Sequence, residues 1–469
     1  MRSIILTSIL SLIAVMSTAQ TEELEFIKEK NYYQYDADFL PASFHKARRD
    51  SIRAALPDSS AMVLFANPER NRSNDVYYEY HQDPNFYYLT GLREPNAMLI
   101  LYKEEQEING KKVDELLLMQ ARNPSSEIWN GRRLGVDKAA EELLFDQVLA
   151  NTSFQDLEVH FNNLKSIYYE APYSLEEQKD TDGSTLSGLY KQFKAKDSTN
   201  TKSSELLAGM LLSKFRQIKT KEEIALLRKA IAITCEAQNE LMRTIQPNMA
   251  EYETEAIIEY VFKKNGAEYP GFPSIQGSGE NSCILHYTSN RRPLKNGGLL
   301  VSDVGAEYRG YTADVTRTIP PNGKFSKEEK QIYELVLKAQ TAGIEASVVG
   351  ASFWAPGQVA TEIIGEGLKK LGIIKHAKEV KKYFMHGTSH YLGLDVHDAG
   401  MYMPLEAGNV ITVEPGIYIA EDSDCDPKWW NIGVRIEDDI LILEKGPENL
   451  SASSPRTVKE IEALMLKSK

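Results

Sequence analysis

Cysteine is scarce in this chain: three residues, Cys235, Cys283 and Cys425, occur in a sequence of 469. An odd number of widely spaced thiols is not the pattern of a cysteine zinc cluster or of a disulfide framework. We therefore expect single buried thiols. A bridge between Cys283 and Cys425 is the alternative that the sequence leaves open.

Long apolar runs are also missing. The first residues combine Arg2, a short apolar run from Ile4 to Val15, and the small residues Ser17-Thr18-Ala19, which together are typical of a signal peptide. This run falls short of the ~20 residues that a membrane span needs, and no later stretch is long and apolar enough. We expect residues 1–19 to be cut off after Ala19, the protein to be exported to the periplasm or secreted, and the mature chain to have no membrane span. A buried N-terminal helix is the alternative.

Positive charge is in deficit. The 54 Lys and Arg residues are outnumbered by 67 Asp and Glu residues, which gives a formal net charge of −13. Such a surface repels a phosphate backbone, so no nucleic-acid partner is expected. The hydrophobic content of 42% and the charged content of 26% are those of a soluble globular protein.

The length predicts two or three domains. In residues 36–204, a helical pattern at 41–56 and strand-like segments that start at Ala61, Asn96 and Asp114 favour an α/β domain. The polar segment 180–204 is interpreted as the end of this domain and a linker.

Residues 205–466 separate helical and β-rich blocks, which favours an α+β domain. Capping boxes at Thr220–Glu223 and Ser326–Glu329 mark the starts of two helices. Two more helices are expected at about 252–265 and 358–371, each followed by a glycine. The segments between these helices are rich in β-branched residues.

Two aspartates interrupt apolar, strand-forming segments: Asp303 in "LLVSDVGA" and Asp314 in "TADVTRTI". A hairpin centred between Tyr308 and Arg309 would place them opposite each other, with Cβ atoms ~5 Å apart. Two carboxylates that close cannot both stay ionised unless a cation lies between them. The alternative is that both flank a turn at the surface.

Two glutamates repeat this pattern. Glu414 follows four strand-forming residues and precedes Pro-Gly, and Glu437 lies in an apolar strand near Arg435. An ion pair with Arg435 is the simpler explanation for Glu437 alone. Burying an unpaired carboxylate costs several kcal/mol, so four such acids need a shared explanation, and a metal centre supplies one.

Three of the eight histidines, His386, His390 and His397, fall between Met385 and Gly400. His390 can offer a neutral imidazole nitrogen to a metal, although alone it would more often be a turn residue. Four carboxylates and one imidazole suit manganese, cobalt, iron or zinc ions. This set is too large for one small ion and suits two ions ~3.5–4 Å apart.

The motifs "SDVGAEYRGYTADVTRTIP", "HGTSHYLGLDVHD", "TVEPGIY" and "RIEDD", in this order, closely resemble the metallopeptidases of the pita-bread fold. Within that group the chain is similar to aminopeptidase P, the Xaa-Pro aminopeptidases, and "EIWNGRRLG" resembles part of that family's N-terminal domain. The resemblance covers about residues 36–464. It implies a pita-bread catalytic domain and release of the N-terminal residue from peptides with proline in the second position.

The resemblance also implies a role for each site residue. Two divalent ions, manganese by first expectation, would share a hydroxide that attacks the scissile carbonyl. Asp303 would bind one ion, His390 and Glu414 the other, and Asp314 and Glu437 would bridge both. Glu414 would also relay a proton.

Further residues would act on the substrate. His286 and His397 match the active-site histidines that stabilise the transition state, while His386, Arg435 and, less closely, Tyr418 match the pocket on the proline side. Family members that form homo-oligomers, expected here as a dimer or tetramer, bring this N-terminal domain toward a neighbour's site. Asp75 and Trp129 are therefore candidate substrate-lining residues in trans, with fold packing or surface exposure as the alternative.

Three other functions stay open at this stage. A prolidase would use the same chemistry on Xaa-Pro dipeptides alone. A non-catalytic pita-bread protein would bind peptides but would have lost metal-binding acids. A creatinase-like hydrolase works without metal. The filled ligand positions argue against the non-catalytic protein and the creatinase-like hydrolase. The motif "HGTSH" and the N-terminal domain resemble aminopeptidase P more than a prolidase.

Overall fold

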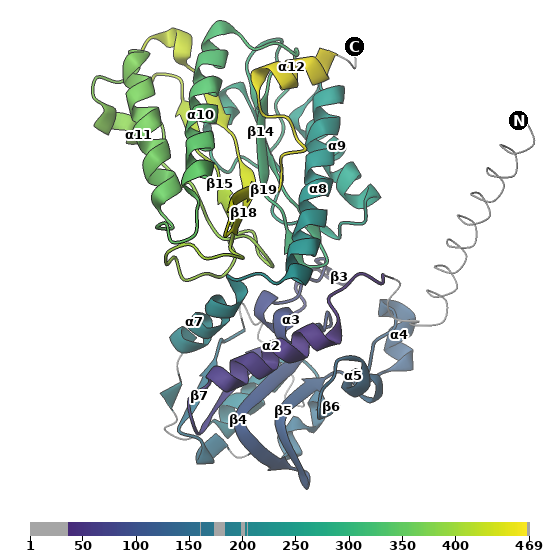
Figure 1. The fold of residues 1–469 in the computed structure, drawn as a ribbon. Helices are drawn as coiled ribbons and strands as arrows, with labels where there is room; N and C mark the ends of the chain where they lie inside the picture. Colours follow the sequence, from purple (N-terminus) through teal and green to yellow (C-terminus); the bar gives the residue numbers. More distant parts are fainter. Residues whose placement is uncertain (1–35, 160, 173–182, 198–201, 204, 467–469) are drawn as a thin grey trace, which may run out of the picture. The chain divides into compact units, whose positions relative to one another are not determined.

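The structure is a computed structural model that describes residues 36–159, 161–172, 183–197, 202–203 and 205–466 (Figure 1). The chain divides into two compact units after Ala208. The expected signal peptide lies outside the described residues. Among the helices of the described ranges, none is both long enough and apolar enough to cross a membrane.

The first unit is built on a mixed six-stranded sheet in the order β6-β5-β4-β1-β7-β8. Strand β1 is antiparallel to β4 and parallel to β7, and its six residues are all buried. The helix α2 packs on α3 and β4. The elements of this unit are α2 (Ala42–Ala55), β1 (Ser60–Phe65), β2 (Asn71–Ser73), β3 (Val76–Tyr77), α3 (Pro84–Thr90), β4 (Met98–Ile108), β5 (Lys111–Met119), α4 (Pro124–Asn130), α5 (Val136–Glu142), β6 (Val148–Ala150), η1 (Asn151–Asp156), η2 (Phe161–Asn163), β7 (Ser166–Tyr169), α6 (Leu186–Lys196) and β8 (Lys202–Ser203).

The polar segment 180–204 includes the helix α6, which belongs to the first unit. Leu186, Leu189 and Phe193 lie on one face of this helix and are buried in the core of the first unit. Their spacing of three and four residues is the amphipathic pattern of a helix. The many lysines and serines that follow Phe193 hide this short stripe in the composition.

The second unit places two helix pairs around a set of small sheets: α8 packs on α9, and α10 packs on α11 (Figure 1). The two expected capping boxes are confirmed, with Thr220 opening α8 and Ser326 opening α10. The helices are α7 (Glu205–Arg216), which runs across the division between units, α8 (Lys221–Thr244), α9 (Glu251–Lys264), α10 (Lys327–Ala346), α11 (Ala355–Lys370), α12 (Val458–Leu466) and the short η3 (Gly279–Cys283), η4 (Ala377–Lys382) and η5 (Pro427–Trp429).

The strands of the second unit form the sheets β10-β11-β14, β13-β12-β9, β15-β18-β19 and β16-β17. They are β9 (Tyr269–Pro270), β10 (Ile275–Ser278), β11 (Leu300–Val304), β12 (Ala306–Tyr308), β13 (Tyr311–Thr312), β14 (Val315–Ile319), β15 (Val410–Val413), β16 (Gly416–Ile419), β17 (Ile432–Arg435), β18 (Asp438–Leu443) and β19 (Gly446–Asn449). Helices on both sides of these strands leave most strand residues buried.

The hairpin register differs from the expected one. Arg309 and Gly310, with φ of 53° and 84°, form the two-residue turn, so Tyr308 pairs with Tyr311. A turn with both central residues at positive φ matches the twist of a hairpin. Asp303 therefore pairs with Thr316, not with Asp314. A shift of two residues keeps Asp303 and Asp314 on the same side of the ribbon, because side chains alternate with a period of two.

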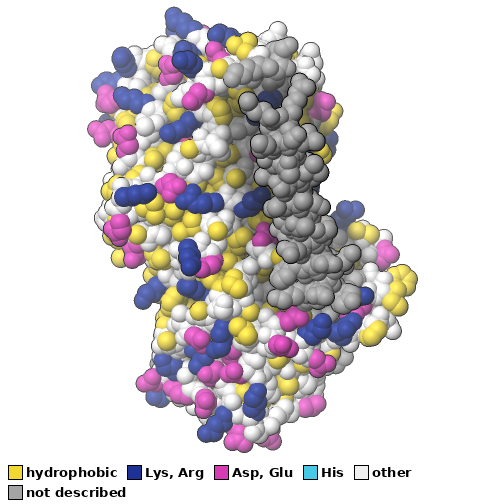
Figure 2. Space-filling model, turned by 45° about the vertical axis from the view of Figure 1, so that its right-hand side comes forward, with side chains coloured by type: hydrophobic (Ala, Val, Ile, Leu, Met, Phe, Trp, Pro, Cys, Tyr) yellow, Lys and Arg dark blue, Asp and Glu magenta, His cyan; other side chains and the backbone are white. Residues whose placement is uncertain are grey.

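All three cysteines are free thiols: Cys235 is buried, and Cys283 and Cys425 are half-buried. On the face of the molecule in Figure 2, acidic and basic side chains are interspersed, with hydrophobic side chains between them. Such mixed surfaces are typical of soluble proteins.

Candidate metal centre and peptide pocket

The four expected acids converge from separate strands of the second unit. Asp303 lies in β11, Asp314 directly precedes β14, Glu414 directly follows β15, and Glu437 lies between β17 and β18. One ligand atom each of Asp314, Glu437 and His390 lie within 4.8 Å of one another. Strand ends therefore bring together two acids, Asp314 and Glu437, that are 123 positions apart in the sequence.

His390 faces these acids with one ring nitrogen. Its Nε2 lies 3.4 Å from Asp314 Oδ2 and 3.5 Å from Glu414 Oε1. Its Nδ1 lies 3.0 Å from the carbonyl oxygen of Tyr391. A carbonyl oxygen can only accept, so Nδ1 carries the hydrogen and Nε2 presents a lone pair, as in metal-ligating histidines.

The donors around the acids leave some of their oxygen atoms without a hydrogen bond. Burial, followed by repulsion from neighbouring carboxylates, raises the pKa of Asp314 and of Glu437 well above the usual range, and burial also raises the pKa of Glu414. The buried Oδ1 atoms of Asp303 and Asp314 have no hydrogen-bond donor. Oxygen atoms that lack donors and repel each other fit the coordination of divalent cations.

The acids line one wall of a cavity of about 560 Å³. The apolar part of the lining consists of Phe272, Pro273, Ile275, Leu285 and Val396. The cavity also contains His286, His386, His397 and Arg435. An apolar pocket with a few convergent polar groups is the usual form of a small-ligand or peptide site.

A chain of hydrogen bonds connects Asp303 with His386. Arg435 donates from Nη2 to Asp303 Oδ2 (2.5 Å) and from Nη1 to the hydroxyl of Tyr418 (2.9 Å). The Tyr418 hydroxyl lies 2.9 Å from His386 Nε2. Burial and the Arg435 charge lower the pKa of His386 to about 4, so its ring is neutral at pH 7. Arg435 pairs with Asp303 and not with Glu437, which was the alternative explanation for Glu437.

The remaining two histidines reach the cavity from loops. The ring of His397 packs edge-on against the ring of His390, with centroids 4.4 Å apart. Burial, followed by the proximity of His390, lowers the pKa of His397. His286 is exposed, and it follows Leu285 in the loop after η3. Both rings can therefore offer N–H groups to a polar atom in the cavity.

Comparison with known proteins agrees with this geometry. Residues 225–444 match the model of metallopeptidase family M24, and residues 45–168 match the aminopeptidase P N-terminal domain. The chain is 40% identical to the Xaa-Pro aminopeptidase of Haemophilus influenzae over 439 residues, which are 91% of this chain and 98% of that protein. The chain belongs to the aminopeptidase P family.

Solved structures of family members have the same fold. The structure of aminopeptidase P from Escherichia coli with the inhibitor Pro-Leu superposes on this chain with a TM-score of 0.81. The two chains are 36% identical, and the match covers 92% of this chain and 99% of the other. The Xaa-Pro aminopeptidase of that organism is 40% identical to this chain over 434 residues, 89% of this chain and 96% of its own length. The combination of an aminopeptidase P N-terminal domain with a pita-bread catalytic domain is thus confirmed.

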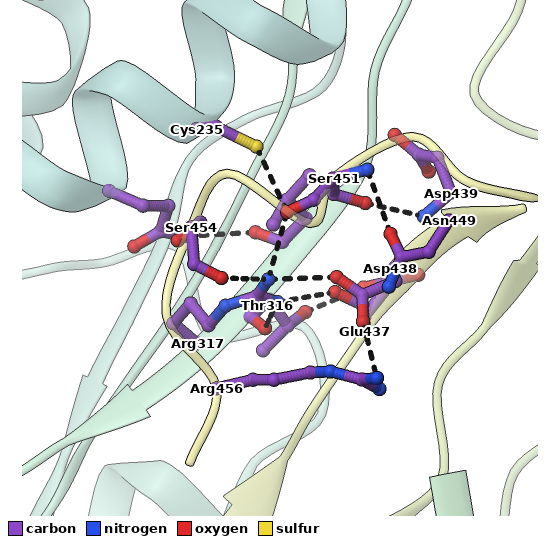
Figure 3. A network of polar contacts seen from close by, with 12 residues as sticks. Cys235, Thr316, Arg317, Glu437, Asp438, Asp439, Asn449, Ser451, Ser454 and Arg456 are labelled. Atoms are coloured by element: carbon purple, nitrogen blue, oxygen red, sulfur yellow. Dashed lines mark hydrogen bonds and ion pairs between the residues drawn. The ribbon is translucent and has the colours of Figure 1, made fainter. Parts of the chain in front are cut away.

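Residues that the motifs did not single out hold the acids of this aminopeptidase P family member in place. Thr316 Oγ1 donates a 2.6 Å hydrogen bond to Glu437 Oε2. The Arg317 guanidinium, fully buried, donates to Asp438 Oδ1 and to the carbonyl oxygens of Thr316 and Glu437 (Figure 3). Asp439 Oδ2 accepts from the backbone N–H of Asp314. Three consecutive acids in an apolar strand, "EDD", are the sequence signal that could have pointed to this network.

Two candidate residues lie in the first unit. Asp75 is exposed in the turn between β2 and β3, and Trp129 is 86% exposed in α4. Their predicted role in trans stays a prediction.

Proposed function

We propose that this protein is an Xaa-Pro aminopeptidase that hydrolyses the bond between an N-terminal residue and a following proline. The observation that carries the proposal is the convergence of Asp314, His390 and Glu437 on a common point at one wall of a peptide-sized cavity. The Xaa-Pro aminopeptidases of Haemophilus influenzae and Escherichia coli are similar over nearly the whole chain.

Two divalent cations would be held at this wall by Asp303, Asp314, His390, Glu414 and Glu437, with manganese as the first expectation and zinc, cobalt or iron as alternatives. Four carboxylates and one imidazole exceed what one small ion requires, and the buried Oδ1 atoms of Asp303 and Asp314 have no hydrogen-bond donor. When bound, such ions acidify water and polarise a carbonyl group. The zinc-substituted aminopeptidase P of Escherichia coli, solved with product, is a structural neighbour.

The protein's own groups would complete the chemistry. The raised pKa of Glu414 places this carboxyl closer to neutral pH, which suits a group that takes up a proton and passes it to the leaving nitrogen. His286 and His397 would donate N–H groups to the oxyanion that develops on the scissile carbonyl. The lowered pKa of His397 keeps this ring neutral, so it binds without adding charge.

The proline ring would occupy the part of the cavity beside His386, Tyr418 and Arg435. The nitrogen of an Xaa-Pro bond is tertiary and carries no hydrogen. A site for this bond therefore needs apolar surface for the ring rather than an acceptor for an N–H. The apolar part of the lining that includes Phe272 and Leu285 supplies such surface.

A prolidase is the alternative within the same chemistry, and peptide length separates the two. Purified protein loaded with manganese is assayed on Ala-Pro, Ala-Pro-Ala and Ala-Ala-Ala, with free alanine measured by chromatography. Release of alanine from Ala-Pro-Ala, but little from Ala-Ala-Ala, supports the proposal. Hydrolysis of Ala-Pro alone would make the protein a prolidase, and no hydrolysis of any peptide would leave a binding protein.

Two further properties are proposed, export and a homo-oligomeric state. The apolar segment before Ala19 motivates export with cleavage after Ala19. N-terminal sequencing of the protein from its native host tests this, and a chain that begins at Met1 contradicts export.

The exposed Trp129 and Ile128 of α4 motivate a homo-oligomer. Light scattering tests this, and a monomer contradicts it.

A further inference from the structure

One buried carboxylate outside the metal centre is saturated with hydrogen bonds. Glu251 is the first residue of α9, and its side chain is fully buried. Both of its oxygens accept. Oε1 accepts from Ser278 N (2.8 Å), Ser278 Oγ (2.8 Å) and Asn281 Nδ2 (3.1 Å), and Oε2 accepts from the hydroxyl of Tyr287 (2.9 Å) and from Arg292 N (2.9 Å).

These donors all belong to one loop, residues 278–292. Ser278 and Arg292 are its two ends, and they also bond to each other, from Arg292 Nη1 to the carbonyl oxygen of Ser278 (2.9 Å). The backbone N–H of Glu251 in turn donates to the carbonyl oxygen of Arg292. The loop is therefore closed around a single carboxylate, as in compact surface loops whose ends lie close together.

The same loop supplies one side of the cavity. Leu285, His286 and Thr288 line it, and the carbonyl oxygen of Leu285 accepts from Arg435 Nη2 at 3.3 Å. His286 itself is exposed, so packing does not fix its ring. Its place is set by its neighbours, and Tyr287, the next residue, is fixed by its hydroxyl bond to Glu251.

Only an ionised carboxylate satisfies this set of donors. A glutamine at position 251 would keep one acceptor oxygen and turn its NH₂ group toward donors that need an acceptor. The first turn of a helix also favours negative charge. Charge-assisted hydrogen bonds of this kind are about twice as strong as neutral ones.

We infer that Glu251 is a positioning residue, which holds the loop 278–292 so that His286 and Leu285 face the metal wall of the cavity. The inference rests on the proposed function, because it assigns Glu251 a role through the oxyanion donor His286. Glu251 touches no substrate, and its effect on hydrolysis passes through the loop.

The test compares Glu251→Gln with Glu253→Gln. Glu253 lies in the same turn of α9, is exposed, and caps the helix through Ala250 N without touching the loop. Hydrogen exchange of the amides of residues 284–289 is measured for both variants and the wild-type protein. Each protein is also assayed for Ala-Pro-Ala hydrolysis and bound manganese. The same assays are repeated with each substitution combined with His286→Ala.

The expected result has three parts. Exchange at 284–289 speeds up in Glu251→Gln but not in Glu253→Gln, while bound manganese is unchanged. The kcat of Glu251→Gln falls roughly 10- to 100-fold, as expected for a misplaced catalytic group. In the His286→Ala background the same substitution lowers kcat by less than about threefold, because coupled residues are not additive.

Unchanged exchange at 284–289, or an equal loss of kcat with and without His286, would overturn the inference. If Glu251→Gln does not fold, Tyr287→Phe takes its place, because it removes a single donor to Glu251. This variant must show faster exchange at 284–289 and a lower kcat, both to a smaller extent. Exchange and kcat equal to those of the wild-type protein would also overturn the inference. If the wild-type protein releases no alanine, the proposed function fails, and the exchange comparison still decides the role of Glu251.

Discussion

The ring of His397 stands edge-on to the ring of His390 at a centroid distance of 4.4 Å and an interplanar angle of 71°. A candidate oxyanion donor is thus in contact with a candidate metal ligand, although His397 is not part of the close ligand group. The two histidines should therefore differ in role, with His397 acting in hydrolysis and His390 in metal binding.

Replacing His397 by alanine should lower kcat without removing the metal. Loss of one oxyanion donor reduces kcat by about 10²- to 10³-fold in other hydrolases. Steady-state kinetics on Ala-Pro-Ala and metal analysis of the same samples measure both properties. A variant that loses its manganese would show that His397 supports metal binding instead.

The hydroxyl of Thr316 should tune the centre through Glu437. Thr316→Val removes the 2.6 Å donor to Glu437 and the acceptor for Arg435 Nε. Loss of such a supporting bond typically lowers metal affinity or activity by about 10- to 100-fold. Thr316→Ser keeps the hydroxyl and is the matched control. Manganese titration of both variants distinguishes them, and equal affinities contradict a role for the hydroxyl.

Metal binding should be linked to pH through the acids. Burial and mutual repulsion raise the pKa values of Asp314 and Glu437. A carboxyl with a raised folded-state pKa stabilises the fold fully below its unfolded pKa, near ~4, and loses this contribution as the pH rises through the folded pKa. The metal-free protein should therefore lose stability as the pH rises above about 4.

A divalent cation takes the place of those protons. The increase in Tm on adding manganese should be larger at pH 8 than at pH 5, and calorimetry at the two pH values measures it. An increase that is the same at both pH values, or larger at pH 5, would show that the acids are not the ligands.

A buried ion triad should stabilise the turn that carries His397. Asp398 accepts from Arg216 and from Lys219 Nζ (2.7 Å), and all three side chains are buried. Burial alone would raise the pKa of Asp398, but these two cations lower it. Asp398→Asn leaves both cations without a counter-charge, which costs about 3–5 kcal/mol in comparable pairs.

Urea unfolding of the metal-free protein measures this loss. Asp395→Asn, an exposed change in the same turn, should alter the free energy of unfolding by less than about 0.5 kcal/mol. If both variants unfold at the same urea concentration as the wild-type protein, the triad does not stabilise this turn.

The elements that sequence patterns could predict are those with local signals. The box Thr220–Glu223 opens α8 because its two side chains satisfy backbone N–H groups three residues apart. Glu414 lies at a strand end, as the following Pro-Gly predicts. The acids that interrupt apolar, strand-forming segments are visible in the same local way.

Features set by distant contacts were not predictable. The hairpin register depended on which pair of residues took positive φ, and Arg309 with Gly310 formed the turn one residue later than expected. The Arg317–Asp438 pair joins β14 to β18 across 121 positions, and Glu251 gathers donors from 27 to 41 positions away. No short pattern records such pairings, because tertiary packing selects them.

Titration of the metal-free protein with manganese, with Ala-Pro-Ala hydrolysis followed at each step, tests the metal centre most directly. Activity that is absent without metal and saturates at two ions per chain, with Glu437→Ala inactive at every concentration, is the predicted result. Full activity in the metal-free protein, or in Glu437→Ala, would contradict it.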